Sequence, residues 1–172
     1  MSYIVTTKFN TKTWTENCQY RNEKNIRCIY GSPCEFPQKV DYGGLVFVLE
    51  MNNDMNIIEG IGLIKNMPCG KQHNIYKDMN YNRHIYKSKY RLRRDELIKS
   101  DDKCTLLNIL EYIVFYEKNH LKRGSGFALL NQQLINKKSH EEIKKIKLPK
   151  IIQMLKRIFK VEFNNNNNNN NI

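Results

Sequence analysis

Two apolar segments separated by a short polar one constrain the fold most strongly. Residues 45–49 are continuously apolar and rich in β-branched and aromatic side chains, and residues 57–64 are mostly Ile and Leu, with one glutamate and two glycines. Each run is too short for a buried helix, so both predict strands. The intervening Asn and Asp residues tolerate the left-handed backbone of tight turns, which predicts an antiparallel hairpin. We expect the rest of the chain to be arranged around this hairpin.

Two glycines in the second run indicate that another group approaches this strand closely. Gly60 and Gly62 stand two residues apart, so on a strand they face the same side. A strand that lacks two side chains on one face leaves room for a bend, a packed helix or a ligand. The alternative is that both glycines belong to ordinary turn chemistry.

The remaining patterns predict an α+β fold. Residues 3–9 and 26–30 are rich in strand formers. Apolar residues spaced i, i+3, i+4 predict amphipathic helices over residues 103–117 and 148–159. Residues 10–15 are polar apart from one tryptophan, and we expect them to form a loop.

Chain length and C-terminal composition set the expected domain boundaries. The 172 residues suffice for one domain with a substantial core, which we place at residues 1–163. The polyasparagine tract at 164–171 cannot bury apolar area. Residues 164–172 are therefore expected to form a disordered tail.

The charge balance favours an anionic partner. The chain has 29 lysines and arginines against 17 acidic residues, a net charge of +12, which indicates RNA, DNA or an anionic surface. No apolar run is long enough to span a bilayer, and the first ten residues do not resemble a signal peptide. No membrane partner is expected.

The cysteines and histidines predict neither a metal site nor a disulfide framework. The five cysteines form no close C-x-x-C pair, and no two of the four histidines have the spacing of helical metal ligands. An odd number of cysteines is typical of a reducing compartment, so an intracellular location is expected. No metal or other cofactor is predicted. The cysteines are Cys18, Cys28, Cys34, Cys69 and Cys104.

Two basic segments are candidate phosphate-binding sites. The first would form one basic face of a strand, because its charged residues alternate with uncharged ones; it comprises Lys87, Lys89, Arg91 and Arg93. In the second, Lys122 and Arg123 precede Gly124-Ser125-Gly126, a loop whose charge and open backbone amides suit phosphate. The alternative for both segments is a solvated surface.

Trp14 and its neighbours are candidate base-binding residues. The Trp14 ring could stack on a base while the Asn10 amide bonds the base edge. Tyr30 and Ser32, at the end of the second predicted strand, could close the same pocket. The alternatives are that Trp14 plugs one end of the core and that residues 30–33 form an ordinary turn.

A resemblance to a known family supports the binding hypothesis. The order of a strand, a polar segment with Trp14, a short strand, Val46-Phe47-Val48 and then Glu59-Gly60-Ile61-Gly62 resembles the PUA-like superfamily, in particular its YTH and EVE domains. Residues 121–126 fall where YTH-like domains carry a basic glycine loop. The polyasparagine tract and the overall pattern also resemble a protein of a large DNA virus.

This resemblance implies a small, mostly β barrel with flanking helices that binds RNA or DNA. Members of the family often enclose a modified base in an aromatic cage. Asn10 would match the polar segment and Trp14 one wall of the cage, with Tyr30, Tyr42 and Tyr76 as candidates for a second wall.

Two other function classes remain open. A nuclease-like enzyme on the related ASCH-type fold would need acidic, histidine or lysine groups that converge in a pocket. No catalytic motif is present, and Glu50 and Glu59, which flank the hairpin loop, are expected to be solvated. A basic structural or virion-packing protein would need no pocket at all.

Overall fold

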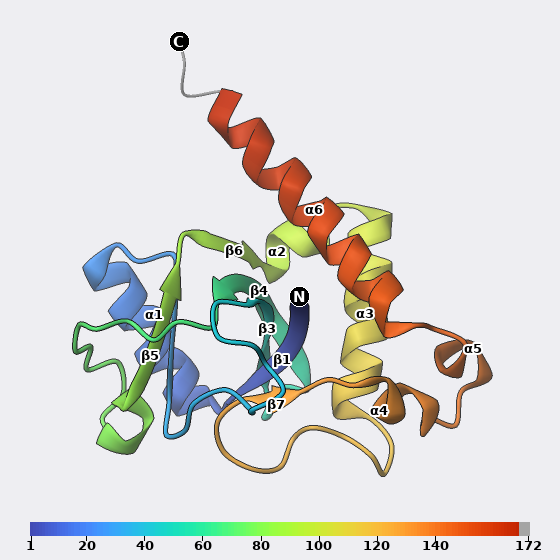
Figure 1. Cartoon of the computed structure of the whole chain (residues 1–172), viewed down its shortest axis with the longest axis horizontal. Helices are drawn as coiled ribbons and strands as arrows, with labels where there is room; N and C mark the ends of the chain where they lie inside the picture. The colour runs from blue at the N-terminus through green and yellow to red at the C-terminus, as the bar shows by residue number, and fades with distance from the viewer. Residues whose placement is uncertain (169–172) are drawn as a thin grey trace.

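The computed structural model describes residues 1–168, and a five-stranded sheet lies at its centre (Figure 1). The strand order is β6-β4-β3-β1-β7, with β1 and β3 parallel and the other neighbours antiparallel. A parallel pair needs a long crossover, which residues 10–44 provide. The strands are β1 (Ser2–Phe9), β3 (Leu45–Asn52), β4 (Ile57–Lys65), β6 (Tyr90–Arg93) and β7 (Ala128–Leu129).

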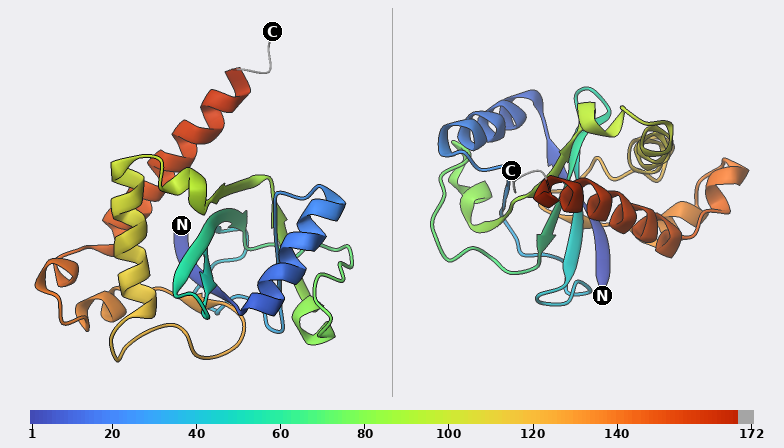
Figure 2. Two further views of the ribbon diagram at one scale, coloured as in Figure 1. Left: turned by 180° about the vertical axis from the view of Figure 1, so that it is seen from behind. Right: turned by 90° about the horizontal axis from the view of Figure 1, so that it is seen from above.

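A second, two-stranded sheet and several helices surround the large sheet. Strand β2 (Cys28–Ser32) pairs antiparallel with β5 (His84–Ser88). Helix α1 (Thr11–Lys24) lies on one side of the molecule, and α3 (Asp101–Phe115) and α6 (Leu148–Asn168) lie on the other (Figure 2). The short helices are η1 (Met79–Asn82), α2 (Arg94–Leu97), α4 (Gln132–Asn136) and α5 (Glu141–Lys144).

The predicted central hairpin is confirmed. Strands β3 and β4 pair antiparallel, with Val48 opposite Gly62. Asn56 in the connecting turn has a φ of 54°, a left-handed conformation that asparagine tolerates. The register shifts between Leu49 and Met51, because two residues of β4, Glu59 and Gly60, lie opposite the single residue Glu50, so β4 carries a bulge. A bulge changes the direction in which a side chain points.

Both faces of the large sheet are buried, which explains the continuous apolar run of β3. Phe47, Leu49 and Met51 belong to the core that α3 and α6 cover. Val46 and Val48 belong to the second core, which includes residues of β2 and β5. Alternate residues of one strand therefore stabilise two different layers.

The two predicted amphipathic helices are confirmed. Helix α3 begins and ends two residues earlier than expected, and α6 begins at the expected Leu148 but continues to Asn168. Helix α3 buries Leu106 and Leu110, and α6 buries Ile151, Leu155 and Phe159. The α+β class is also confirmed. The barrel is not: within residues 1–168 the large sheet stays open at β6 and β7, and β2 pairs only with β5.

The C-terminal tail expected at residues 164–172 is described only in part. Helix α6 continues to Asn168, and residues 169–172 lie outside the described residues. The disorder of the tail stays a prediction.

The prediction of a loop at residues 10–15 is wrong, because helix α1 begins in this segment. Asn10 is the N-cap: its side-chain oxygen accepts a hydrogen bond from the Thr13 backbone N–H (2.8 Å), and its own N–H donates to the Thr13 hydroxyl (3.1 Å). The helix buries only Asn17 and Arg21, so no apolar stripe could reveal it. The Asn-x-x-Thr cap, followed by a long stretch without Gly or Pro, was the available signal.

Candidate functional site

A fully buried carboxylate organises the candidate site. Glu50 is 0% exposed and accepts hydrogen bonds from the Tyr30 hydroxyl (2.7 Å) and from Arg91 Nε and Nη2 (2.7 and 2.6 Å). Arg21 Nη1 lies 3.8 Å from the same carboxylate. Burial raises the pKa of Glu50, but the charge and hydrogen bonds of Arg91, with Arg21 and Tyr30, outweigh it and hold the pKa below its ordinary value. The carboxylate is ionised and fixes both guanidiniums.

The two glycines of β4 make room for this cluster. A Cβ on Gly60 would lie 2.7 Å from Glu50 Oε2, and a Cβ on Gly62 would lie 2.1 Å from the Tyr30 hydroxyl oxygen. The groups that approach the bare face of β4 are therefore Glu50 and Tyr30 themselves. The expectation of a solvated Glu50 is wrong, because alternation along β3 places this carboxylate on the same buried side as Val46 and Val48. The glycines of β4 leave room for it there.

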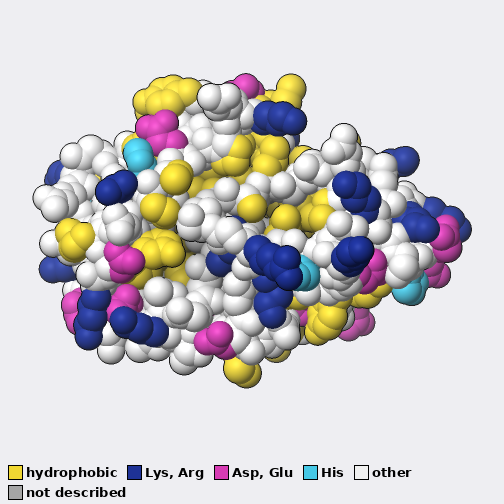
Figure 3. All heavy atoms as spheres, turned by 90° about the horizontal axis from the view of Figure 1, so that it is seen from below, with side chains coloured by type: hydrophobic (Ala, Val, Ile, Leu, Met, Phe, Trp, Pro, Cys, Tyr) yellow, Lys and Arg dark blue, Asp and Glu magenta, His cyan; other side chains and the backbone are white. Residues whose placement is uncertain are grey.

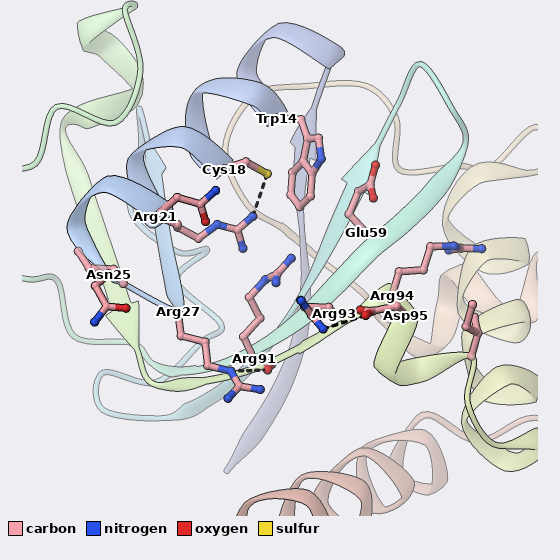
Figure 4. A pocket seen from close by; sticks show the side chains of 13 residues that line it. Trp14, Cys18, Arg21, Asn25, Arg27, Glu59, Arg91, Arg93, Arg94 and Asp95 are labelled. Atoms are coloured by element: carbon pink, nitrogen blue, oxygen red, sulfur yellow. Dashed lines mark hydrogen bonds and ion pairs between the residues drawn. The ribbon is translucent and has the colours of Figure 1, made fainter.

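An open cleft of about 850 Å³ lies next to the cluster, bordered by α1, β4, β6 and α2 (Figure 4). Trp14 and Glu59 line it from α1 and β4. Five arginines line it as well: Arg21, Arg27, Arg91, Arg93 and Arg94. No other side-chain type contributes as many lining residues, so the cleft suits an anionic ligand.

The Trp14 ring lies beside two buried guanidiniums of this cleft. Arg21 Cζ is 5.0 Å and Arg91 Cζ is 5.8 Å from the ring centroid, distances typical of cation–π contacts. The other neighbour is Phe9, whose ring meets the indole at 69° with centroids 5.1 Å apart. Trp14 is half-buried, so it packs against the core and also lines the cleft.

The two buried arginines, Arg21 and Arg91, carry more positive charge than their counterion neutralises. Arg21 and Arg91 share one buried counterion, Glu50, which leaves one net positive charge beside the indole. The low local dielectric strengthens the attraction of this charge for an anion.

Arg27 and Arg93, the two exposed arginines of the cleft, are paired with carboxylates that are at least partly exposed. Arg93 contacts Asp95 at 2.8 Å, and Arg27 contacts Glu96 at 3.3 Å. Exposed ion pairs contribute only ~0–1 kcal/mol, so an anionic ligand can compete for these guanidiniums. Charge alone does not mark the site, since lysines and arginines are scattered among acidic residues over the face seen from below (Figure 3).

Asn10 and Trp14, which were predicted to share a pocket, line different cavities. Asn10 lines a smaller cavity of about 200 Å³, as does its neighbour Thr13. The Asn10 side chain is also committed to capping α1. This smaller cavity is further lined by Lys8, Gly31, Asn53, Tyr76, Tyr81, Gly124 and Gly126. Asn53 Oδ1 is buried and has no hydrogen-bond partner within the described part of the chain.

Tyr30 and Ser32 are buried, and neither lines the Trp14 cleft. Tyr30 donates to Glu50, and the Ser32 hydroxyl donates to the Cys34 carbonyl oxygen (2.6 Å). Tyr30 therefore acts on the cleft indirectly, because it holds Glu50, which in turn holds Arg91. Ser32 closes its own turn and lies near the glycine loop, because a Cβ on Gly126 would be 3.0 Å from its hydroxyl oxygen.

The single basic face expected over residues 87–93 is not formed. The chain leaves β5 at Ser88 and enters β6 at Tyr90, so alternation is interrupted at Lys89. Lys87 and Lys89 are exposed, whereas Arg91 is buried against Glu50. Arg91 and Arg93 both line the cleft. Arg91 does so as a buried partner of Glu50, and Arg93 as an exposed charge.

The predicted basic glycine loop lies beside the smaller cavity. Lys122 Nζ donates to Asn56 Oδ1 (2.7 Å), and Arg123 is exposed. Gly124 and Gly126 have φ values of 82° and 70°, a left-handed backbone that glycine adopts without strain. The loop could therefore bring charge to the mouth of this cavity.

Sequence reasoning missed Arg21, Arg27 and Arg94. Arg21 follows Trp14 by seven residues, so both lie on one face of α1 once that helix is recognised. Arg27 and Arg94 reach the cleft only through tertiary packing, for which no local signal exists.

Within residues 1–168, no three His, Cys, Asp or Glu side chains are grouped so that they could hold a metal ion. The same residues contain no helix with the length and apolar character needed to cross a membrane. Comparisons of the chain with protein-family models, curated proteins and solved structures found no match.

Proposed function

We propose that the chain is a nucleic-acid-binding module of PUA-like type that holds single-stranded RNA or DNA in the Trp14 cleft. The observation that supports this function is the half-buried indole with Arg21 and Arg91 within 6 Å of its ring centroid. Unpaired bases stack on aromatic rings and guanidinium planes, and phosphates pair with arginine. A cleft that offers both an indole ring and several guanidiniums suits a nucleotide better than an inorganic anion.

Each of the two cavities would bind a different part of the nucleic acid. The arginine-lined cleft would take the sugar-phosphate strand and one stacked base. The smaller cavity, with Tyr76, Tyr81 and the Asn53 carbonyl oxygen that has no partner among residues 1–168, would take a second base. The resemblance to YTH and EVE domains supports this assignment, since those domains enclose a base.

A nuclease is the second candidate, because Glu59 and Asp95 line the same cleft. Asp95 is paired with Arg93, and Glu59 accepts a hydrogen bond from Asn52 (2.7 Å). Cleavage of a labelled oligonucleotide that is lost in Glu59→Gln would favour the enzyme over the binding module.

Replacing Trp14 with alanine is expected to weaken the binding of a short single-stranded oligonucleotide by ~1–3 kcal/mol, the contribution of one stacked base. Exposed Tyr42 provides the control, because it lines neither cavity; Tyr42→Ala should leave Kd unchanged. Fluorescence anisotropy measures Kd, and circular dichroism at the assay temperature measures the folded fraction. An unchanged Kd for Trp14→Ala, or a loss explained by unfolding alone, would contradict the proposal.

Binding is expected to weaken steeply as salt rises, because the arginines displace counterions from phosphates. The double variant Arg27→Gln, Arg93→Gln should flatten the plot of log K against log salt concentration by about 0.7 per lost contact on a single strand. The charge-matched control is Lys145→Gln, Lys150→Gln, since both lysines are exposed and lie outside the cleft. Equal slopes for the two doubles would instead indicate a basic structural protein without a specific site.

A further inference from the structure

A thiol, an imidazole and a phenol lie in contact away from the arginine cleft. Cys69 Sγ is 3.9 Å from His73 Nε2, and His73 Nδ1 is 2.8 Å from the Tyr20 hydroxyl. The Tyr20 and His73 rings meet nearly at right angles, at 80°. The Tyr20 contact fixes the imidazole so that Nε2 faces the sulfur.

The arrangement is that of a nucleophile, a base and a group that orients the base. When Nδ1 carries the imidazole proton and donates it to the Tyr20 oxygen, the lone pair on Nε2 is free to accept the Cys69 thiol proton. Burial, followed by the positive charges of Lys87 and Lys71, lowers the pKa of His73. The ring is therefore neutral near pH 7 and able to act as a base.

The thiol also opens onto a cavity with positive charge. Cys69 is half-buried and lines a cavity of about 410 Å³ together with Lys71 and Arg83. A small molecule with a negative charge would be held there, next to the sulfur.

We propose that Cys69 is a reactive thiol that undergoes exchange with anionic low-molecular-weight disulfides. The Cys69 S–H proton passes to His73 Nε2, and the sulfur attacks one sulfur of the disulfide. A new S–S bond forms at Cys69, the S–S bond of the reagent breaks, and the departing thiolate takes the proton from His73. One disulfide is consumed and one thiol released, so no further oxidant is needed. This inference does not rest on nucleic-acid binding.

The protein contains its own controls for this reaction. Cys104 is half-buried like Cys69, but its hydrogen-bonding neighbour is the Asn108 amide. Cys34 is exposed, so its rate of modification measures the effect of solvent access alone. Cys28 is 0% exposed and should react only if the fold is lost.

The test is the rate of modification at each cysteine, followed by peptide mass spectrometry after mixing with glutathione disulfide. We expect Cys69 to react at least about tenfold faster than Cys104 and Cys34, a modest share of the ~10²–10⁴-fold that a general base supplies. His73→Asn should remove this advantage while Cys28 stays unmodified. If His73→Asn exposes Cys28, Tyr20→Phe serves as the second variant and should also slow Cys69.

The charge of the reagent tests the proposed ligand class. The variant Lys71→Gln, Arg83→Gln should slow the reaction of Cys69 with glutathione disulfide but not with neutral bis(2-hydroxyethyl) disulfide. The proposal is overturned if Cys69 reacts no faster than Cys104, or if neither His73→Asn nor Tyr20→Phe slows its reaction. It is also overturned if Lys71→Gln, Arg83→Gln slows the reactions with both disulfides equally.

Discussion

Replacing Glu50 with glutamine is expected to lower the free energy of unfolding by about 3–5 kcal/mol, the cost of leaving a buried charge without its partner. Glutamine keeps the size of the side chain but removes the negative charge. Arg91 is 6% exposed and Arg21 is 7% exposed, so neither guanidinium can turn to water without disturbing the core. The Tyr30 hydroxyl would keep an acceptor, because the glutamine carbonyl oxygen can replace one carboxylate oxygen.

The matched control is Glu35→Gln, which removes the same charge from an exposed site. Glu35 is exposed, and within residues 1–168 its ion-pair contact is with His84 at 3.7 Å, so the change should stay within about 0.5 kcal/mol. Urea denaturation followed by circular dichroism measures both variants. If both variants lose equally little stability, Glu50 does not organise the cluster.

The pH dependence of the stability difference between wild type and Glu50→Gln follows from the lowered pKa of Glu50. A carboxyl whose pKa is lower in the folded state contributes stability that is complete above its unfolded pKa of about 4.3. That contribution is lost as the pH falls through the lower folded pKa. The stability difference between wild type and Glu50→Gln is therefore expected to be largest near pH 7 and to shrink in acid.

The parts of the fold that the sequence predicted correctly depend on short-range patterns. The β3–β4 hairpin and helices α3 and α6 each bury an apolar face, so their period is visible within one segment. Helix α1 shows the limit of that reasoning. It is polar on nearly every side, and its position depends on the Asn10 cap and on the contacts of Asn17 and Arg21 with the rest of the protein.

The candidate site could be predicted only in fragments for the same reason. The sequence predicts binding roles for both Trp14 and Arg91, but their contact depends on Glu50, which is 41 residues from Arg91 in the chain. One local sign existed: Glu50 stands between Leu49 and Met51 in an otherwise apolar strand. A charge at such a position is buried and must be paired. Sequence alone does not say which of the 29 basic residues supplies the partner.

Replacing Leu155 with alanine is expected to cost about 2–5 kcal/mol of stability, because it would leave a cavity in a close-packed core. Leu155 is 0% exposed, and on the next turn of α6 the Phe159 ring meets Phe47 of β3 at 5.4 Å between centroids. The control is Val161→Ala on the same helix. Val161 is 49% exposed, so its truncation should change stability by no more than about 0.5 kcal/mol.

The Leu155 variant also tests whether α6 supports the cleft. Phe163, two turns further along α6, packs against Tyr90 (5.1 Å between centroids) and lies 5.2 Å from the Arg27 guanidinium, and Arg27 lines the cleft. A helix that fits poorly at Leu155 would hold this arginine less firmly. Urea denaturation should therefore give a lower midpoint at an unchanged m-value, and oligonucleotide affinity should fall slightly while the protein is still folded. A loss of stability like that of Val161→Ala would show that α6 lies at the periphery and contributes nothing to either core or cleft.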